Sequence, residues 1–341
     1  MPLYLDKNEN PFQTPKEIRD AVAEKISGLM FNRYPDPGYP SLKRKLADLA
    51  GLSPESVVTG SGGDEILAMI FSRFVRPGDP VLTFSPTFSE YYRLSRMAGA
   101  RHITLPIHME GDEAVFPAGP FLEAVEREKP ALVLLDTPNN PSGASLPSSF
   151  IGDVIARSES FVVVDEAYGE FADSTFLAGF SGKGIPDRVI VLKTLSKAWG
   201  MAGIRFGWAY CGISAASPLE EARSPFNVGI FQEAAAEIVL DHPEFPAISA
   251  QKVKKLRESV RQCINVLEGW KAFRSDGNFL LLRIPFPEGM VRSAAEEDFC
   301  FKFLGLTPET GNRECWIRLT IGTEDEMAEV LRFFSLLGKK S

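Results

Sequence analysis

Short apolar segments alternate with helical patterns through the middle of this 341-residue chain, and this alternation constrains the fold most strongly. Amphipathic patterns, for example at 64–74 and 88–97, predict the helices. The predicted strands are 57–59, 81–84, 131–136, 161–165, 188–192 and 205–210. Strands that alternate with helices are typical of an α/β fold, in which helices cover both faces of a mostly parallel sheet. In such sheets ligands bind at the carboxyl ends of the strands.

The pattern changes after about residue 232. A long amphipathic helical stretch is predicted up to residue 269, and segments 279–284 and 316–321 are predicted to be strands of a separate, small sheet. We therefore expect a small α/β domain beside the large one. Residues 33–235 are expected to form the large ligand-binding domain and residues 236–341 the small C-terminal domain, with residues 1–32 joining the small domain.

Charge and residue usage exclude several classes of function. The formal net charge of −8 repels polyanions, so a nucleic-acid partner is not expected. The chain has no apolar run near the ~20 residues that span a bilayer and no charged-then-apolar leader after Met1, so we expect no membrane partner and a cytoplasmic location. The four cysteines and three histidines show no ligand spacing, so no metal site is expected.

Lys197 is the first candidate for chemistry. It lies in segment 194–200, just after a predicted apolar strand. A lysine held in an apolar cleft is partly deprotonated and can form a Schiff base with a carbonyl group. Most lysines are solvated surface charges, so this segment alone does not decide between the two interpretations.

Asp165 ends the apolar segment 161–165. A carboxylate buried there costs several kcal/mol unless it meets a positive partner. A protonated pyridine nitrogen is such a partner, and keeping it protonated makes the ring an electron sink. The alternative is that Asp165 caps the helix that follows.

Two loops add candidate binding groups. Segment 59–65 contains Gly62 and Gly63, which allow the backbone to approach an anion at a helix N-terminus. A plain turn is the alternative, and the segment fits neither the dinucleotide nor the P-loop pattern. In segment 136–143 the prolines fix a turn from which Asn140 points out of the strand end. Its amide could donate a hydrogen bond to a ring oxygen.

Together these segments resemble the fold-type I aminotransferases, which depend on pyridoxal 5'-phosphate (PLP). The resemblance rests on Lys197 after a serine, Asp165 in Asp-Glu-Ala-Tyr, the Asn-Asn-Pro-Ser-Gly turn, and Arg205 shortly after the lysine. Within that class, segments 6–11, 32–36, 196–203 and 223–228 are similar to histidinol-phosphate aminotransferases. Threonine-phosphate decarboxylases share much of this framework. The implied activity is amino transfer between histidinol phosphate or an α-amino acid and 2-oxoglutarate, as in amino-acid biosynthesis.

The resemblance also implies a role for each cofactor residue. Lys197 would form the aldimine and later move the proton at the substrate carbon, with Asp165 and Tyr168 as the other catalytic residues. Asp165 would pair with the pyridinium nitrogen, and Tyr91 would stack on the ring. The remaining cofactor contacts would come from Asn140 and Tyr168 at the phenolate oxygen and from Gly62, Gly63, Asp64, Thr194, Ser196 and Arg205 at the phosphate.

Other residues are expected to complete the site. Tyr34 would reach the phosphate from a partner subunit, so the resemblance implies a homodimer. Asn10, Asn140 and Arg318 would bind the substrate. The planar guanidinium of Arg318 can hold an anion with two parallel hydrogen bonds.

The chain departs from the histidinol-phosphate pattern at two places. That family usually has an arm with a Pro-Tyr pair ahead of the Asn-Glu-Asn segment, and a second arginine about a dozen residues before the position of Arg318. Here only Lys302 and Arg313 could replace that arginine. Losing one charge-assisted bond to a phosphate costs roughly 1.5–3 kcal/mol. We therefore predict that a plain α-amino acid with an apolar or aromatic side chain reacts at least as well as histidinol phosphate.

Other readings remain open from the sequence. They are an aromatic amino acid aminotransferase, a threonine-phosphate decarboxylase-like enzyme, a nicotinamide dehydrogenase, and a non-catalytic module built on an aminotransferase-like fold. The dehydrogenase reading lacks its glycine-rich loop, and the non-catalytic one lacks a DNA-binding segment, while every catalytic position is filled.

Overall fold

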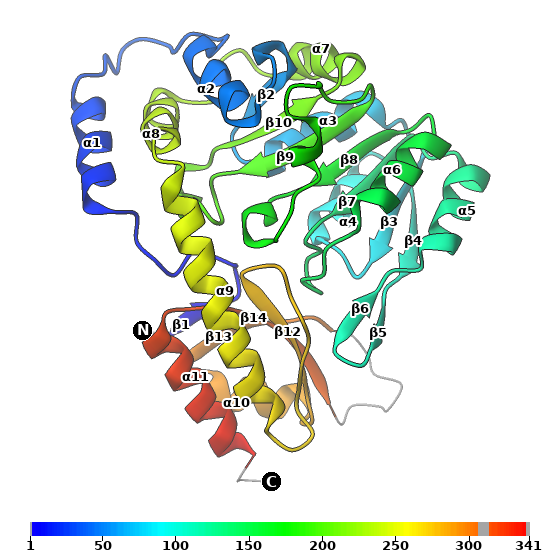
Figure 1. Cartoon of the computed structure of the whole chain (residues 1–341), viewed down its shortest axis with the longest axis vertical. Coiled ribbons are helices and arrows are strands. Elements are labelled where there is room, and N and C mark those ends of the chain that lie inside the picture. The colour runs from blue at the N-terminus through cyan, green and yellow to red at the C-terminus, as the bar shows by residue number, and fades with distance from the viewer. Residues whose placement is uncertain (1, 306–313, 339–341) are drawn as a thin grey trace.

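The computed structural model describes residues 2–305 and 314–338. Figure 1 shows a large sheet above and a small sheet below, with the long helix α9 (Glu244–Asn265) running between them. No helix within these two ranges is long and apolar enough to cross a membrane.

The large sheet has seven strands in the described part of the chain, and all but one run parallel. In spatial order they are β2 (Val57–Gly60), β10 (Gly207–Cys211), β9 (Val189–Thr194), β8 (Phe161–Asp165), β7 (Leu132–Asp136), β3 (Pro80–Ser85) and β4 (Arg101–Pro106). β10 is antiparallel to both neighbours. The sequence predictions for six of these strands are confirmed to within a few residues. β10 starts later than predicted because Arg205 has φ +57°, which is not a strand conformation.

Helices cover both faces of this sheet, which confirms the predicted fold class. One face is covered by α2 (Pro40–Ala50), α5 (Ala118–Glu128), α6 (Ser148–Arg157) and α8 (Ile230–Leu240), and the other by α3 (Gly63–Phe74), α4 (Ser89–Met97) and α7 (Ile213–Ala222). Successive strand residues point to opposite faces. In β8, Val162 and Val164 pack into the hydrophobic core on the face covered by α2, α5, α6 and α8. Val163 packs into the core on the opposite face.

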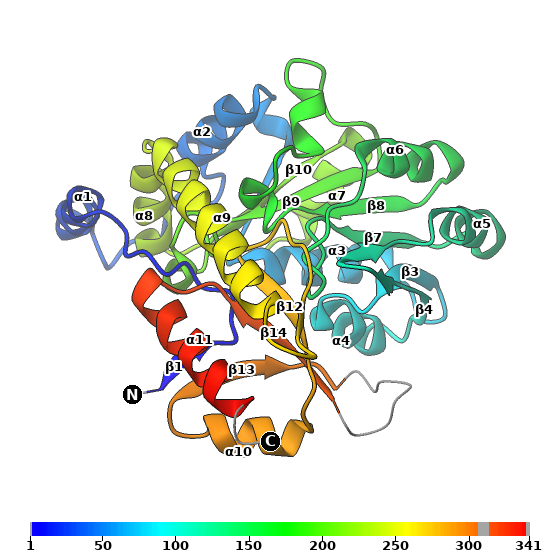
Figure 2. The same cartoon turned by 60° about the horizontal axis from the view of Figure 1, so that its bottom comes forward.

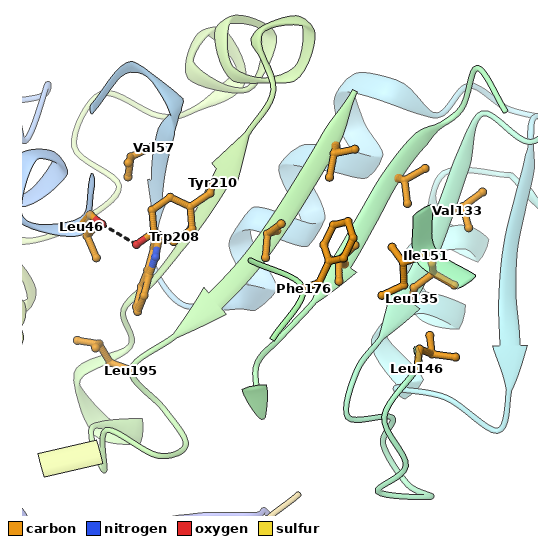
Figure 3. Close-up of a cluster of buried hydrophobic side chains, with 14 of the residues drawn as sticks. Leu46, Val57, Val133, Leu135, Leu146, Ile151, Phe176, Leu195, Trp208 and Tyr210 are labelled. Carbon is orange, nitrogen blue, oxygen red and sulfur yellow. Dashed lines mark hydrogen bonds between the residues drawn. The ribbon is translucent and has the colours of Figure 1, made fainter. Parts of the chain in front are cut away.

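Figure 3 shows part of the hydrophobic core on the face covered by α2, α5, α6 and α8. Trp208 and Tyr210 extend from β10, and the Tyr210 hydroxyl donates to the carbonyl of Leu46 on α2 at 2.6 Å. Tyr210 is almost fully buried, and this bond gives its polar end a partner. A sheet held so firmly on both faces provides a rigid edge for the loops that follow its strands.

The small sheet has five strands within the described ranges and combines a strand near the N-terminus with strands from the C-terminal part of the chain. In spatial order they are β1 (Leu3–Leu5), β13 (Phe299–Phe303), β14 (Cys315–Thr320), β12 (Phe279–Ile284) and β11 (Lys271–Ala272). Helices α9, α10 (Glu288–Ala295) and α11 (Glu324–Leu337) contribute to its core. β1 pairs in parallel with β13, so the N-terminal segment joins this sheet (Figure 2).

The remaining elements are short or peripheral. They are α1 (Lys16–Ser27), which packs against α8, the hairpin β5 (His108–Glu110) and β6 (Glu113–Val115), and the 3-10 turns η1 (Pro54–Ser56), η2 (Gly169–Phe171), η3 (Leu177–Phe180) and η4 (Ala202–Ile204). The domain boundaries near residues 32 and 235 stay predictions.

One helix prediction was wrong in its extent. The stretch from 232 to 269 is two helices, because α8 ends at Leu240 and α9 begins after Pro243. Proline lacks an N–H and favours the first turn of a helix over its interior. The break lets α8 pack on the large sheet while α9 crosses to the small one.

Candidate active site

The carboxyl ends of the parallel strands meet at one edge of the large sheet. Asp136, Asp165 and Thr194 are the last residues of β7, β8 and β9. A cavity opens at this edge, lined by Gly63, Asp64, Leu67, Phe88, Asp136, Asn140, Asp165, Ala167, Tyr168, Leu192, Thr194, Ser196, Lys197 and Arg205. We call it the cofactor-side cavity. Most residues that the sequence analysis assigned to the cofactor therefore lie together.

Asp165 is a buried carboxylate with defined partners. Its Oδ2 accepts from the hydroxyl of Tyr91 at 2.7 Å, and its Oδ1 accepts from the backbone N–H of Ala167 at 3.0 Å. Burial raises the pKa of Asp165 above its ordinary value, although the bond from Tyr91 lowers it. A cation in the cavity would offset the cost of burying this charge. The position at the end of a buried strand matches the sequence interpretation.

Gly63, Asp64 and Arg205 also line the cavity, and Gly62 lies beside them without being a lining residue. Gly62, with φ +86°, precedes α3, and a Cβ added there would lie 2.8 Å from Nη2 of Arg205. The backbone therefore approaches the guanidinium more closely than another residue would allow. Nη2 of Arg205 also lies 3.1 Å from the carboxylate of Asp64. A helix N-terminus beside a guanidinium forms an anion site.

Two residues with hydroxyl groups also lie in the lining. The Thr194 hydroxyl donates to Ser196 Oγ at 3.0 Å, and the backbone N–H of Ser196 donates to Thr194 Oγ1 at 3.1 Å. Both residues are buried, and both line the cavity. The pair thus adds two hydroxyls to a cavity that also contains the N-terminus of α3, and hydroxyls and a helix N-terminus are groups that bind a phosphate.

Two nearby lysines have different environments. Lys193 is buried in β9, with its Nζ 3.0 Å from Glu170 and 3.7 Å from Glu166. Burial lowers the pKa of Lys193, but these two carboxylates outweigh it and raise the pKa above its ordinary value. Lys197 lies in the loop after β9, and its Nζ donates to the carbonyl of Lys7 at 2.9 Å. Of these two lysines, Lys197 is the one that lines the cavity.

A second cavity adjoins the first and shares Phe88, Asn140, Tyr168 and Lys197 with it. Its complete lining is Asp6, Lys7, Pro86, Thr87, Phe88, Ser89, Asn140, Pro141, Tyr168, Lys197, Lys302, Phe303, Leu304 and Arg318. We call it the substrate-side cavity. Because the two cavities share Lys197, a molecule in one can be reached by the same amine as a molecule in the other.

Arg318 of β14 lies in the wall of the substrate-side cavity. Its Nη1 donates to Asn140 Oδ1 at 2.5 Å, and its Nη2 donates to the carbonyl of Asp6. Its Nε is buried and has no partner among the described residues. Lys302 of β13 is directly opposite Arg318 in the register of the two strands. Arg318 and Lys302 are therefore neighbouring cations among those that line this cavity.

Asp136 holds the turn that carries Asn140. Its carboxylate accepts from the Thr87 hydroxyl at 2.9 Å, from the Asn139 side chain at 3.0 Å, and from the backbone N–H of Asn140 at 2.9 Å. Burial raises the pKa of Asp136 to about 6. The sequence analysis quoted this turn but gave Asp136 no role. Its place at the end of an apolar strand, like that of Asp165, was the signal.

Tyr91 is not where the sequence analysis expected it. Its ring is fully buried, and its hydroxyl binds Asp165, so the ring face is not available to a molecule in the cavity. Phe88 lines both cavities and meets Tyr91 edge to face, with ring centroids 5.7 Å apart. The two aromatic residues lie one turn apart at the start of α4, and the sequence did not distinguish the inner one from the outer one.

Two further predicted residues, Asn10 and Tyr34, lie away from the cavities. Asn10 is not among the lining residues, because its amide nitrogen donates to the carbonyl of Ala198 at 2.9 Å and to the hydroxyl of Ser249 at 2.7 Å. Tyr34 is 79% exposed and stacks on Phe226 on the surface of its own chain. Arg313 lies outside the described residues. Within those residues no group of three or more metal-ligating side chains occurs.

Comparisons with known proteins identify the family. The model of the family described as aminotransferase class I and II matches residues 2–334. The chain belongs to the class I and II aminotransferases. Proteins of this family use PLP, so PLP is the cofactor of this enzyme. The family also settles the enzyme class against the dehydrogenase and non-catalytic readings.

Sequence relatives and a solved structure show which enzymes of the family the chain resembles. The chain is 32% identical to a histidinol-phosphate aminotransferase of Chromobacterium violaceum, over 97% of this chain and 92% of the relative. It is 33% identical to one from Caldanaerobacter subterraneus subsp. tengcongensis, over 82% of this chain and 78% of the relative. A solved histidinol-phosphate aminotransferase from Sinorhizobium meliloti, in complex with PLP, shares the fold with a TM-score of 0.87 at 24% identity, covering 99% of this chain and 91% of that one. The enzyme is therefore a histidinol-phosphate aminotransferase-like protein.

The cofactor-side cavity fits PLP. Asp165 supplies a buried carboxylate, Gly62 lacks the Cβ that would crowd the guanidinium of Arg205, and Lys197 supplies an amine at the junction of the cavities. When bound, PLP supplies an electron sink at the substrate carbon. The residues of this cavity would hold the ring, keep its nitrogen protonated and place the amine.

Proposed function

We propose that this enzyme transfers an amino group from histidinol phosphate to 2-oxoglutarate, with Lys197 as the residue that carries the cofactor and moves the proton. The observation that supports this most directly is that Lys197 lies where two cavities meet. One cavity has the groups that PLP needs, and the other has Arg318 and Lys302 for an anionic substrate. An anion fork beside a reactive amine is what a transaminase requires at its substrate side.

The roles of the other residues follow from their positions. Asp165 holds the ring nitrogen protonated, while Tyr168 and Asn140, which line both cavities, bind the ring oxygen. Phe88 takes the stacking role that the sequence analysis gave to Tyr91, since its ring faces the cavity. Gly62, Gly63, Asp64, Thr194, Ser196 and Arg205 bind the phosphate. Lys197 then receives and returns the proton through Nζ.

The donor depends on how many cations meet its anionic group. The sequence analysis predicted that a plain α-amino acid reacts at least as well as histidinol phosphate, because a second arginine is missing. That remains a prediction, but Lys302 lies opposite Arg318 in the strand register and lines the same cavity. A phosphate dianion can use both cations, whereas a carboxylate needs only the arginine fork. This observation and the relatives favour histidinol phosphate.

The test compares kcat/KM for histidinol phosphate and for phenylalanine, each with 2-oxoglutarate, in the wild type and in Lys302→Gln. We expect the wild type to prefer histidinol phosphate, and Lys302→Gln to reduce that preference about tenfold, since one charge-assisted bond is lost. Lys252→Gln, which removes a surface cation of α9 above Phe12, is the control. A wild type that prefers phenylalanine would support the alternative that a plain α-amino acid is the donor. An equal loss of kcat/KM for both donors would show that Lys302 does not recognise the phosphate group.

We also propose that the active unit is a homodimer in which Tyr34 completes the partner's site. The aromatic residues Phe31, Tyr34, Phe226 and Phe231 are exposed and form two contacting pairs, Phe31 with Phe231 and Tyr34 with Phe226. Exposed apolar clusters of this kind mark protein interfaces. Within its own chain Tyr34 is not among the residues of the cofactor-side cavity, so it can contribute only from another subunit.

Mixed dimers test this arrangement. Subunits carrying Tyr34→Phe are refolded with subunits carrying Lys197→Ala, and the cofactor affinity of the hybrids is measured. If Tyr34 acts in trans, each hybrid regains one site with wild-type affinity. Hybrids without such a site, or an active monomer in sedimentation, would contradict the proposal.

A further inference from the structure

Asn8 is a fully buried polar residue that the sequence analysis did not single out as a site residue. It follows β1 and has φ +54°. The two residues before it touch the site through their backbones, because the carbonyl of Lys7 accepts from Lys197 and that of Asp6 accepts from Arg318. The N-terminal segment is therefore part of the wall around the reactive amine.

Every polar group of Asn8 has a partner. Its backbone N–H donates to Thr320 Oγ1 at 3.0 Å, and its Oδ1 accepts from the same hydroxyl at 3.1 Å. Its carbonyl accepts from the amide of Asn278 at 3.0 Å. Its Nδ2 donates to the hydroxyl of Tyr168 at 2.9 Å. The first three bonds fix Asn8 to the small sheet, and the fourth connects it to the cofactor-side cavity.

The direction of the fourth bond has a consequence for Tyr168. A phenol can accept and donate at the same time. Because the amide of Asn8 is the donor, the hydroxyl proton of Tyr168 is not used in that bond. The Tyr168 ring is held edge to face against Phe279, with centroids 5.1 Å apart. With its ring fixed and one lone pair occupied, the hydroxyl can present its proton to the cavity that it lines.

Charged groups also face Tyr168, and they differ from Asn8 in kind. Nζ of Lys197, from the loop after β9, lies 5.6 Å from the centroid of the Tyr168 ring. Arg318, from β14, interacts with the tyrosine through its charge, and Asp165, at the end of β8, lines the same cavity. Asn8 adds no charge, so its removal changes the orientation of the hydroxyl without changing the charge around it.

We propose that Asn8 is a positioning residue that orients the Tyr168 hydroxyl as a donor to the ring oxygen of the bound cofactor. The proposal rests on the proposed function, which places that oxygen next to Tyr168. Under this proposal the N-terminal segment helps to bind the cofactor.

The test is a spectroscopic pH titration of the holoenzyme. A donor to the ring oxygen stabilises its deprotonated form, so its loss raises the pH at which the visible absorbance of the bound cofactor changes. Tyr168→Phe removes the donor and should raise this midpoint by about one pH unit. Asn8→Gly keeps the positive φ accessible and should raise it by about half a unit. Circular dichroism of the cofactor-free proteins checks that each variant folds.

Two further variants separate orientation from general loosening. Asn10→Ala removes the two bonds that tie the same segment to Ala198 and Ser249 without adding a charge, and it should leave the midpoint unchanged. Thr320→Val loosens Asn8 without replacing it, and it should raise the midpoint in the same direction as Asn8→Gly. Thr320→Val also serves as the test if Asn8→Gly does not fold.

A double variant provides the decisive result. In the Tyr168→Phe background, Asn8→Gly should cause no further change, because the hydroxyl that it orients is gone. A shift of equal size in both backgrounds, or an equal shift from Asn10→Ala, would overturn the role of Asn8. A wild type without a visible band that titrates would instead contradict the proposed function, so the two failures are distinguishable.

Discussion

The two cavities of this enzyme are built in different ways. The cofactor-side cavity takes its key residues from loops directly after strands of one sheet, and its buried carboxylate Asp165 already has two donors. The substrate-side cavity is assembled from segments at both ends of the chain and in the middle. In it, Nε of Arg318 and Oδ1 of Asp6 are buried without partners among the described residues. The comparison indicates that cofactor chemistry is a property of the rigid edge, whereas donor choice depends on how distant segments meet.

Of the variants that test this comparison, Asp165→Asn should have the largest effect on activity, because it changes the cofactor-side cavity alone. An amide cannot keep the ring nitrogen protonated, so the electron sink weakens. We expect PLP to bind and kcat/KM to fall about a thousandfold with every donor, which corresponds to about 4 kcal/mol. Steady-state kinetics and cofactor absorbance measure the two quantities. Near-normal turnover would mean that Asp165 only caps the following turn.

Arg318→Ala should damage the substrate side and spare the cofactor side. The buried guanidinium supplies the anion fork, so we expect kcat/KM to fall about a hundredfold or more with any donor. Cofactor binding should be retained, since Arg318 is not in the lining of the cofactor-side cavity. Arg283→Ala, on the neighbouring strand β12 and half exposed, is the matched control. Loss of cofactor from Arg318→Ala would show that the two cavities are not separable.

Asp136→Asn should have the smallest effect, which is expected as a change in the pH dependence of stability. Burial raises the pKa of Asp136 from 3.8 to about 6, so the stability it contributes is fully present below pH 3.8 and is lost as the pH rises through 6. The difference is at most about 3 kcal/mol. An asparagine stays neutral and escapes this loss.

Thermal unfolding of the cofactor-free proteins at several pH values measures this effect. The Tm of Asp136→Asn relative to the wild type should become more favourable between pH 4 and pH 7. Asp20→Asn, at an exposed position, should show no such trend. A relative Tm that does not depend on pH would mean that Asp136 is not buried as a costly charge.

The difference between the cavities also explains what the sequence could predict. Lys197 and Asp165 were predicted because each lies at or just after the end of a segment whose apolar pattern marks a buried strand, whereas Arg205 was predicted only from the family resemblance. The edge strand β4 was missed because half-exposed strands carry polar residues such as Arg101 and His102.

Local sequence patterns could not predict how the substrate-side cavity is assembled. The wall formed by Asp6, Lys7 and Asn8 depends on the pairing of β1 with β13, which joins residues at opposite ends of the chain. The choice between Phe88 and Tyr91 depends on which side of α4 faces the cavity, and both sides of its first turn carry an aromatic ring. Neither fact has a signature in a short segment.

The central claim is that Lys197, and not the nearby Lys193, carries the cofactor. The most direct measurement is reduction of the holoenzyme with borohydride, followed by digestion and mass spectrometry of the labelled peptide. Lys193 is held as a cation by Glu166 and Glu170, while Lys197 opens into the cavities, so the label should be found on Lys197 alone. A label on Lys193, or no lysine label on a protein that absorbs visible light, would contradict the account.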